Sequence, residues 1–277
     1  MNYAARATMP RFRKRYMILT AVAIVAAGVL VPVVVRRVRP PEEPYFLVRI
    51  LTWNVGRAYG LGGETRAGNE ILDDVARTIQ DADADAVVLQ EIWSGGQLDV
   101  LLAALGGTYT GALSERERTD RAIAILVRGV GTFTPIPSKA GRPKIAATFD
   151  AAPRREVTVV GVHLSAFDPD RRHAEALEIL EWVSTRPERL LLAGDFNLDP
   201  GDPAAGEKDR FTHELLKRDL LDLGAVAGST ALLGRRIDYV FGRPAEIVLA
   251  RPRVVVGRRT GRMDHEPLLV HVGMREL

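Results

Sequence analysis

The sequence contains no cysteine among its 277 residues. This absence excludes disulfide bonds, thiolate metal sites and a cysteine nucleophile, but it assigns no compartment, because exported proteins need not contain disulfides. The first 41 residues lack acidic side chains, and they carry eight of the 38 Lys and Arg residues. The rest of the chain holds 30 basic and 35 acidic residues. It therefore lacks the overall positive charge that is typical of nucleic-acid-binding domains.

One long stretch has no charge: Met17 to Val35 reads MILTAVAIVAAGVLVPVVV. A helix of this length spans about 28 Å, close to the hydrocarbon thickness of a bilayer. We predict an uncleaved transmembrane signal anchor over 17–35, with a cleaved signal peptide or a buried helix as alternatives. Five basic residues precede the run within 1–16 and three follow it within 36–45, a short linker. This bias places the N-terminus in the cytoplasm and the rest of the protein outside.

Residues 46–277 alternate short apolar runs with helical patterns, and neither a repeat nor a low-complexity tract interrupts them. Strands are expected at 46–53, 86–90, 122–127, 144–149, 156–163, 189–194, 236–241, 246–250, 252–256 and 267–272, and helices at 69–80, 97–105, 170–185 and 209–218. Several strands follow one another without a helix between them. This order favours a sandwich of two sheets with helices outside over a doubly wound sheet.

Polar residues stand where these strands begin or end. They are Asn54, Glu91, His163, Asp195, Asn197, Asp238, Asp264 and His265. Each by itself fits a turn or cap, but so many together predict a shared edge of the sheets. Carboxylate and amide oxygens without thiolates suit Mg²⁺ or Mn²⁺. A cation with histidine and asparagine donors around an anionic centre is suited to phosphoryl transfer.

Six motifs carry a family resemblance. In chain order they read LTWNVG, VVLQEIW, GVHLSAF, LLAGDFNLDP, RRIDYVF and MDHEPLLV. Together they resemble the endonuclease/exonuclease/phosphatase superfamily over residues 46–273. The resemblance implies a four-layered α/β/β/α sandwich of two mixed β-sheets, as in deoxyribonuclease I. It also implies hydrolysis of phosphate esters with the help of Mg²⁺ or Mn²⁺.

The resemblance also assigns roles to the metal and water side of the site. Glu91 is similar to the principal metal ligand of the family, with Asn54 and Asp264 close by. Asp195 is similar to the residue that orients or deprotonates the attacking water. Asn197 is expected to position the phosphate and to help hold Asp195.

The histidines are assigned in the same way. His265 resembles the phosphate-facing catalytic histidine, and Asp238 its orienting carboxylate. A buried acid in that position fixes the tautomer and stabilises the imidazolium. His163 is expected to donate to a phosphate oxygen.

The sequence departs from the family pattern in two places. Asp120, Arg121 and Ala122 stand where the family often has Gly-Asn, which puts a substrate-contacting residue in doubt, and Arg118 or Arg121 is a candidate to replace it. Met263 stands where a serine usually precedes the final Asp-His pair.

Arginines crowd the region between the Asp238 and Asp264 motifs. They are Arg235, Arg236, Arg251, Arg253, Arg258, Arg259 and Arg262. Two readings stay open: a phosphate-binding rim, with Arg235 and Arg236 as substrate contacts, or solvated loop and strand arginines.

Other polar residues are expected to be structural. Asp199 precedes Pro-Gly and fits a turn. In the helix at 170–185, an apolar stripe of Ala174, Leu177 and Leu180 with Trp182 or Val183 is expected to face the core. The stripe leaves His173, Glu175 and Glu178 on the solvated face, and His213 is expected to be similar.

These observations favour a membrane-anchored, divalent-metal-dependent phosphoesterase that cleaves phosphodiester bonds, with nucleic acid slightly favoured as substrate. The alternatives are a phospholipid- or sphingomyelin-type phosphodiesterase or a phosphatase, and an interaction domain that lost activity. Retention of both histidines and of all four acids argues against the last. Nothing in the sequence indicates oligomerisation.

Overall fold

The computed structural model describes residues 44–58, 69–114, 122–186, 189–201, 203, 206–261 and 263–276. The basic N-terminus 1–16, the anchor at 17–35 and nearly all of the linker lie outside these ranges, as do Arg118 and Arg121. Within them, no helix is long and apolar enough to cross a membrane.

The first sheet has six strands. In order across the sheet they are β11 (Ile247–Val254), β12 (Leu268–Arg275), β1 (Tyr45–Asn54), β2 (Ala86–Ile92), β4 (Ala122–Arg128) and β3 (Tyr109–Leu113). β1 and β2 pair in parallel, and the other pairs are antiparallel. The parallel pair needs a crossover, which α2 (Asn69–Ala82) supplies.

The second sheet repeats this plan. Its order is β5 (Gly131–Ile136), β6 (Lys144–Ala152), β7 (Arg155–His163), β8 (Leu190–Asp195), β10 (Asp238–Gly242) and β9 (Leu221–Asp222). β7 and β8 form its parallel pair, and α4 (Pro169–Ser184) connects them.

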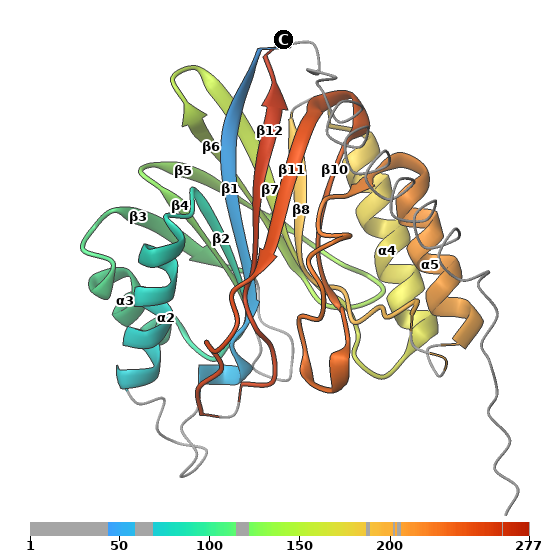
Figure 1. Cartoon of the computed structure of the whole chain (residues 1–277), viewed down its shortest axis with the longest axis horizontal. Helices are drawn as coiled ribbons and strands as arrows, with labels where there is room; N and C mark the ends of the chain where they lie inside the picture. The colour runs from blue at the N-terminus through green and yellow to red at the C-terminus, as the bar shows by residue number, and fades with distance from the viewer. Residues whose placement is uncertain are drawn as a thin grey trace, which may run out of the picture. The chain divides into compact units, whose positions relative to one another are not determined.

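Helices cover the outer faces of both sheets (Figure 1). α2 and α3 (Gly95–Ala104) pack on the first sheet, and α4 and α5 (Gly206–Asp219) pack on the second. A third apolar cluster fills the space between the sheets. In β8, Leu190 and Leu192 face the helices while Leu191 and Ala193 face the other sheet. Burial on both faces explains the unbroken apolar run of this strand. The expected α/β/β/α arrangement of two mixed sheets is confirmed.

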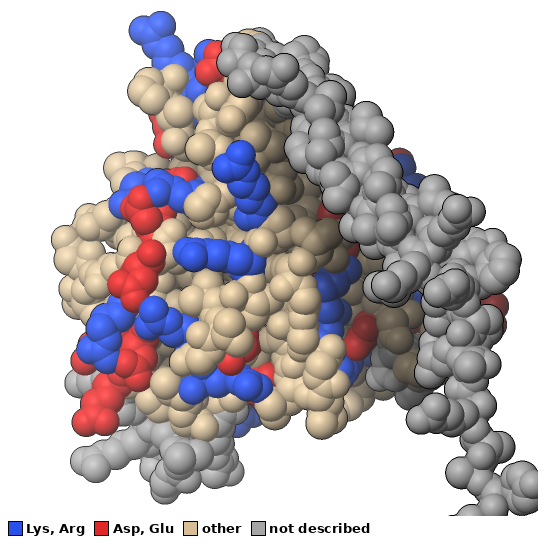
Figure 2. All heavy atoms as spheres, viewed as in Figure 1, with Lys and Arg blue, Asp and Glu red and all other residues tan. Residues whose placement is uncertain are grey.

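Three short 3₁₀ helices complete the described elements. They are η1 (Gly56–Ala58), η2 (Leu232–Gly234) and η3 (Pro244–Glu246). On the surface, Figure 2 shows separate basic side chains among neutral ones over β1, β12 and β11, with acidic side chains gathered towards α2 and α3. This face of the molecule therefore carries both positive and negative side chains, in keeping with the similar numbers of basic and acidic residues in the chain.

The sequence analysis missed the edge strands β3 and β5 and the two-residue β9. β5 alternates exposed and half-exposed residues and contains Pro135, a composition that is tolerated only at a sheet edge. The two strands expected at 246–250 and 252–256 are one strand, β11. Pro252 fits inside it because β11 is an edge strand.

The two parallel strand pairs end at the edge of the sheets where the sequence-predicted site residues lie. Asn54 ends β1, His163 ends β7 and Asp195 ends β8, while Asp238 begins the antiparallel β10 opposite Asp195. Gly194 permits this close approach, because a Cβ at that position would lie 1.9 Å from the carbonyl oxygen of Val162. No other residue fits there without displacing β7.

Candidate active site

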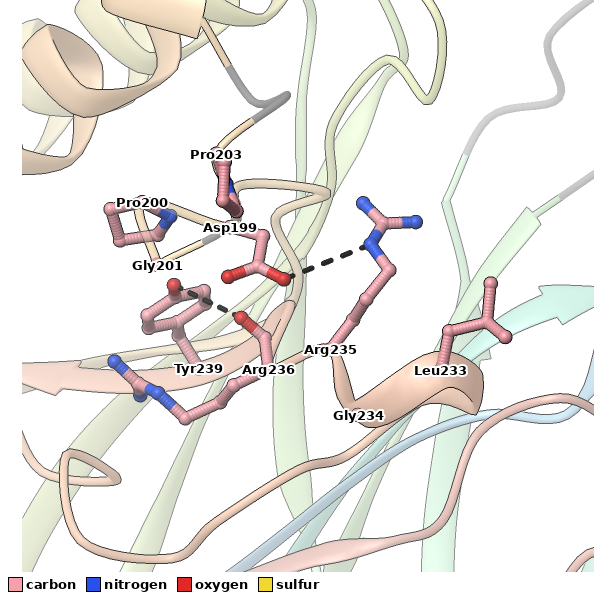
Figure 3. A pocket seen from close by; sticks show the side chains of 9 residues that line it. All are labelled: Asp199, Pro200, Gly201, Pro203, Leu233, Gly234, Arg235, Arg236 and Tyr239. Atoms are coloured by element: carbon pink, nitrogen blue, oxygen red, sulfur yellow. Dashed lines mark hydrogen bonds and ion pairs between the residues drawn. The ribbon is translucent and has the colours of Figure 1, made fainter.

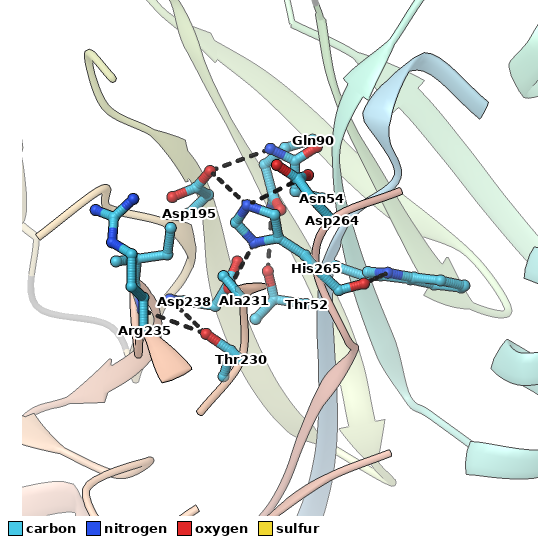
Figure 4. Close-up of polar contacts among 12 residues, drawn as sticks. Thr52, Asn54, Gln90, Asp195, Thr230, Ala231, Arg235, Asp238, Asp264 and His265 are labelled. Atoms are coloured by element: carbon cyan, nitrogen blue, oxygen red, sulfur yellow. Dashed lines mark hydrogen bonds and ion pairs between the residues drawn. The ribbon is translucent and has the colours of Figure 1, made fainter. Parts of the chain in front are cut away.

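A cavity of about 720 Å³ lies at this edge of the sheets. The sequence-predicted residues that line it are Asn54, Glu91, His163, Asp195, Asn197, Arg235, Asp264 and His265. Asp238 lies behind His265 and is fully buried. Figure 4 shows Asn54, Asp195, Asp264 and His265 converging, although they come from segments far apart in the sequence. The structure thus brings together all eight residues singled out at the strand ends.

Asp195 lies at the centre of the cluster and is 1% exposed. Its Oδ1 accepts a hydrogen bond of 2.9 Å from the Asn197 amide, and its Oδ2 accepts one of 3.1 Å from Asn54 Nδ2. Burial, opposed by the nearby charge of His265, raises the pKa of Asp195 to about 6. The carboxylate is therefore largely ionised at neutral pH but more basic than an exposed aspartate, which suits a general base.

His265 forms the second part of the cluster. Its Nδ1 lies 2.7 Å from Asp238 Oδ2 and its Nε2 lies 3.8 Å from Asp195 Oδ2. Burial alone would lower the pKa of His265, but the charge and hydrogen bond of Asp238, followed by the charges of Asp195 and Asp264, raise it to about 10. The ring is then an imidazolium at neutral pH, with Nδ1–H donating to Asp238 and Nε2–H available towards the cavity.

Asp238 is fixed from the backbone side. Its amide donates to Thr230 Oγ1 at 3.2 Å, and Ala231 pairs with His265 as an isolated β-bridge. The indole Nε1 of Trp53 donates to the carbonyl oxygen of His265 at 3.0 Å. The histidine and its carboxylate are thus positioned from both sheets and from the loop before β12.

His163 and Asn197 flank Asp195. His163 Nε2 lies 3.6 Å from Asp195 Oδ2, and the two residues are register partners in β7 and β8. Asn197 has a left-handed backbone with φ of 52°, and its Nδ2 donates to the carbonyl oxygen of Leu164 at 3.1 Å. Asparagine tolerates this backbone conformation better than most residues, which explains its place in the turn after β8.

Glu91 adopts the same left-handed region, with φ of 63°, inside β2. This conformation costs free energy for a glutamate and persists only where the surroundings impose it. It coincides with a register shift in the pairing of β2 with β4 between Leu89 and Ile92. The strand irregularity therefore coincides with the residue that was expected to be the principal metal ligand.

The cavity contains oxygen donors of the kind that bind a divalent cation. Glu91 is half-buried, Asp264 has 60% of its side chain exposed, and both line the cavity. Asn54 adds an amide oxygen, which accepts a hydrogen bond from the Gly56 amide at 3.0 Å. Two carboxylates and an amide oxygen suit Mg²⁺ or Mn²⁺.

Asp195, Asp238 and His265 also lie close enough together to hold a metal. Asp238 is fully buried and His265 Nδ1 is hydrogen-bonded to it at 2.7 Å, so these side chains are less open to an incoming ion. The donor set on the Glu91 side therefore fits a cation better.

Of the candidate substrate contacts, Arg235 lines the cavity. Arg236 does not line it: its guanidinium bonds both carboxylate oxygens of Asp222, at 3.2 and 2.6 Å, and lies over the Tyr239 ring.

The sequence analysis missed several residues that line the cavity, among them Arg57, Phe167 and Leu233. Arg57 follows the LTWNVG motif directly, and its guanidinium lies 5.2 Å from the centre of the Trp93 ring. Its position three residues after Asn54 was the available signal. Phe167 and Leu233 are 96% exposed and have no sequence signal beyond their proximity to the motifs.

The expected orientation of α4 was wrong in part: Leu180, Trp182 and Val183 pack on the core as expected, but two other residues do not follow the prediction. Glu175 is buried, and Leu177 is 47% exposed. The buried residues of this helix are Arg172, Glu175, Ala176, Ile179 and Val183. Glu175 and Arg172 bind the segment after His163. Glu175 Oε2 accepts from the Ser165 amide at 2.7 Å, and Arg172 Nη1 donates to the Ser165 carbonyl oxygen at 2.8 Å.

His213 is buried as well, 3.8 Å from Asp222, and does not lie on a solvated face.

The two mixed sheets between helix layers define the class of the molecule, an α/β sandwich of the deoxyribonuclease I type. A family model described as the endonuclease/exonuclease/phosphatase family matches residues 51–259. The chain belongs to that family, whose name covers enzymes that cleave phosphate esters. No curated protein matches the chain in sequence.

Several solved structures share the fold. An endonuclease/exonuclease/phosphatase from Bacteroides vulgatus aligns with a TM-score of 0.66 and 18% identity, over 83% of this chain and 100% of that one. Truncated TDP2 of Caenorhabditis elegans aligns with a TM-score of 0.60 and 16% identity, over 82% and 98%. A mannosyl-6-phosphatase of Bacteroides thetaiotaomicron gives 0.60 and 20%, over 81% and 99%. At sequence identities this low, the similarity shows a shared fold and nothing more.

Proposed function

We propose that the protein is a divalent-metal-dependent phosphoesterase that hydrolyses phosphodiester bonds. The observation that carries the proposal is the series Asp238–His265–Asp195, with separations of 2.7 and 3.8 Å. It places an ionised carboxylate beside an imidazolium in a buried setting. This pairing supplies a proton acceptor for water and a cationic donor for an anionic centre.

In the proposed mechanism, Asp195 orients the attacking water and accepts its proton. His265 donates a hydrogen bond from Nε2 to a phosphoryl oxygen, and Asp238 keeps its ring in the required tautomer. His163 and Asn197 border the same carboxylate and hold the phosphate from the β7 side. Mg²⁺ or Mn²⁺ held by Glu91, Asp264 and Asn54 would supply positive charge to the phosphoryl group.

Nucleic acid is our first choice of substrate, on the basis of the family name alone. A phospholipid or sphingomyelin-type diester is the alternative. A phosphate monoester is a further candidate, because one similar structure is a mannosyl-6-phosphatase.

We propose in addition that residues 17–35 anchor the protein as a single-pass segment, with the catalytic domain outside the cytoplasm. The uncharged run and the basic residues before it support this. A reporter fused after Leu277 should be active outside the cytoplasm. A cytoplasmic reporter signal would overturn the topology.

The function is tested with the full-length protein on a substrate panel with Mg²⁺, Mn²⁺ or EDTA. The panel holds bis-p-nitrophenyl phosphate, p-nitrophenyl phosphate, plasmid DNA, RNA, sphingomyelin and inositol phosphates. We expect metal-dependent turnover of at least one diester, abolished by EDTA and by Asp195→Asn. Asp150→Asn serves as the control, because Asp150 is exposed in β6. Full activity in EDTA would overturn the metal requirement, and no turnover of any ester would overturn the function.

A further inference from the structure

A second cavity, of about 600 Å³, lies beside the catalytic one (Figure 3). It is formed by the loop that follows the GDFN motif and by the turn that precedes β10, and its polar lining includes Asp199 and Arg235. Leu233 and Arg235 line both cavities, so the two are contiguous. Its volume lies within the range of about 300–1,000 Å³ that is typical of small-molecule sites.

Asp199 and Arg235 form a long ion pair in the lining of this cavity (Figure 3). The Asp199 side chain is only 13% exposed, and its Oδ2 lies 3.8 Å from Arg235 Nε. This distance is too long for a hydrogen bond. Arg235 Nε is buried and has no hydrogen-bond partner within the described part of the chain. The pair thus offers one acceptor group and one donor group to a ligand.

The loops that carry this pair are fixed to each other and to the catalytic residues. The Tyr239 hydroxyl lies 2.9 Å from the Leu198 carbonyl oxygen and 3.2 Å from that of Arg236. Asp199 follows Asn197 by two residues, and Arg235 precedes Asp238 by three. A ligand group in this cavity is therefore held at a defined place relative to the reacting phosphate.

The lining disfavours a nucleobase and a second phosphate. Tyr239 is its one aromatic residue, but the ring is buried between Arg236, at 4.3 Å, and Phe241, which stacks on it at 5.3 Å. A base therefore has no free aromatic face to stack on. Asp222 neutralises Arg236 through two hydrogen bonds, and Asp199 would repel a second phosphate.

The lining also disfavours an acyl chain. An acyl chain would desolvate the Asp199 carboxylate without offering it a hydrogen-bond donor, and such burial is costly. A hydroxyl group donates one hydrogen bond and accepts others, so hydroxyls satisfy both Asp199 and Arg235.

We infer that this cavity binds a hydroxyl-bearing substituent, a sugar or a polyol, of the phosphate ester whose phosphoryl group lies at Asp195 and His265. The inference rests on the proposed function and narrows its substrate class. Asp199 accepts from a hydroxyl of the substituent, and Arg235 donates to the same or to a neighbouring hydroxyl. The turn that was expected to be merely structural then selects the substrate.

The test compares two diesters with the same p-nitrophenolate leaving group. One carries an ethyl group as its second substituent, and the other carries glucose linked through its 6-oxygen. We expect kcat/KM to favour the glucose diester by at least tenfold in the full-length protein. Asp199→Ala and the size-conserving Asp199→Asn should reduce this ratio by about ten- to hundredfold, the range for a hydrogen bond to a charged group.

Asp150→Asn is the matched control and should keep the ratio of the unmodified protein. A ratio near one in the unmodified protein, or an unchanged ratio in both Asp199 variants, would overturn the inference. Hydrolysis of neither diester would count against the proposed function.

The cavity is then tested by ligand binding in EDTA, which prevents the proposed metal-dependent turnover. Isothermal titration calorimetry of the full-length protein should give tighter binding of glucose 6-phosphate than of ethyl phosphate, by at least tenfold. Asp199→Asn should remove most of this difference, with a melting temperature near that of the unmodified protein. Equal dissociation constants for the two phosphates would overturn the inference even if the protein hydrolyses phosphate esters.

Discussion

The two halves of the catalytic cavity differ in how completely the protein itself holds them. Asp195, Asp238 and His265 are almost fully buried: His265 is hydrogen-bonded to Asp238 at 2.7 Å, and Asp195 accepts a hydrogen bond from the Asn197 amide and lies 3.8 Å from His265. On the opposite side, Glu91 is half-buried and Asp264 has 60% of its side chain exposed. The acid–base half is thus the more completely buried, whereas the other half presents more exposed carboxylates, a kind of ligand that suits a divalent cation.

The difference follows from the free energy of burying charge. Two buried carboxylates would repel each other and be poorly solvated, so they need a cation between them. His265 supplies that cation, because its pKa is raised to about 10 and it lies within 3.8 Å of both. In the open half, Asp264 is more exposed, and its contact with His265 Nε2 is longer, at 3.9 Å. A buried, preformed half and an open half should respond differently to substitution.

The largest effect is expected for Asp195→Asn, in the preformed half. Asparagine keeps an oxygen acceptor for the Asn197 amide but cannot take a proton from water. General-base contributions are typically about 10²- to 10⁴-fold, so kcat should fall by at least this much. The melting temperature, measured on the same preparation, should stay within a few degrees, since loss of a cap of this kind costs about 0.5–2 kcal/mol. Near-normal kcat in a folded variant would mean that GDFN is only a turn.

The next largest effect is expected for substitutions of His265 and Asp238, which test whether these two residues act together. His265→Ala and Asp238→Asn should each lower kcat by about 10²- to 10³-fold, as loss of a charge-stabilising donor does. Because the two residues act as one unit, the double variant should be little slower than the slower single variant. A double-mutant cycle on kcat measures this. Effects that multiply would show that Asp238 and His265 act independently.

A smaller effect is expected in the open half, for Glu91→Gln. The substitution removes a charged oxygen but keeps the shape of the side chain. We expect the Mg²⁺ concentration for half-maximal activity to rise by about 10- to 100-fold, with much of kcat recovered at saturating metal. The melting temperature in EDTA should change little, because Glu91 is half-buried and glutamine keeps the shape of its side chain. Loss of kcat without any change in metal dependence would contradict the distinction between the halves.

The sequence could predict the site because its residues stand at the ends of recognisable strands. LLLAGD is apolar on both faces, so the point where its polar residues begin marks the sheet edge. The parallel pairs then bring these ends together. The sequence pattern could not show that Arg236 forms an ion pair with Asp222. That ion pair joins β9 to the turn before β10, and the two segments are separated in the sequence.

Helix periodicity failed in α4 for a similar physical reason. The predicted stripe was right at Leu180 but wrong at Leu177, which is 47% exposed, because the buried face includes two charged residues. Arg172 is buried because it makes an ion pair of 2.6 Å with Asp209 on α5, and Glu175 because it accepts two backbone hydrogen bonds. A hydrophobicity pattern assigns such residues to the surface, since their partners are distant in sequence.

The smallest effect is expected for Glu175→Gln, which tests whether the preformed half depends on its support from α4. Glu175 Oε2 accepts from the Ser165 amide at 2.7 Å and Oε1 accepts from the Arg142 amide at 3.0 Å. Glutamine can accept only one of these bonds, because its NH₂ group would face an N–H. An unsatisfied buried donor costs about 1–3 kcal/mol, which lowers the melting temperature of a domain of this size by about 2–4 °C per kcal/mol.

The control is Glu181→Gln on the same helix, where the exposed side chain predicts a change within about 0.5 kcal/mol. Thermal unfolding in EDTA measures both variants. Equal melting temperatures for Glu175→Gln and Glu181→Gln would mean that the segment after His163 is held in place without Glu175. The preformed half of the site would then not depend on α4 for its stability.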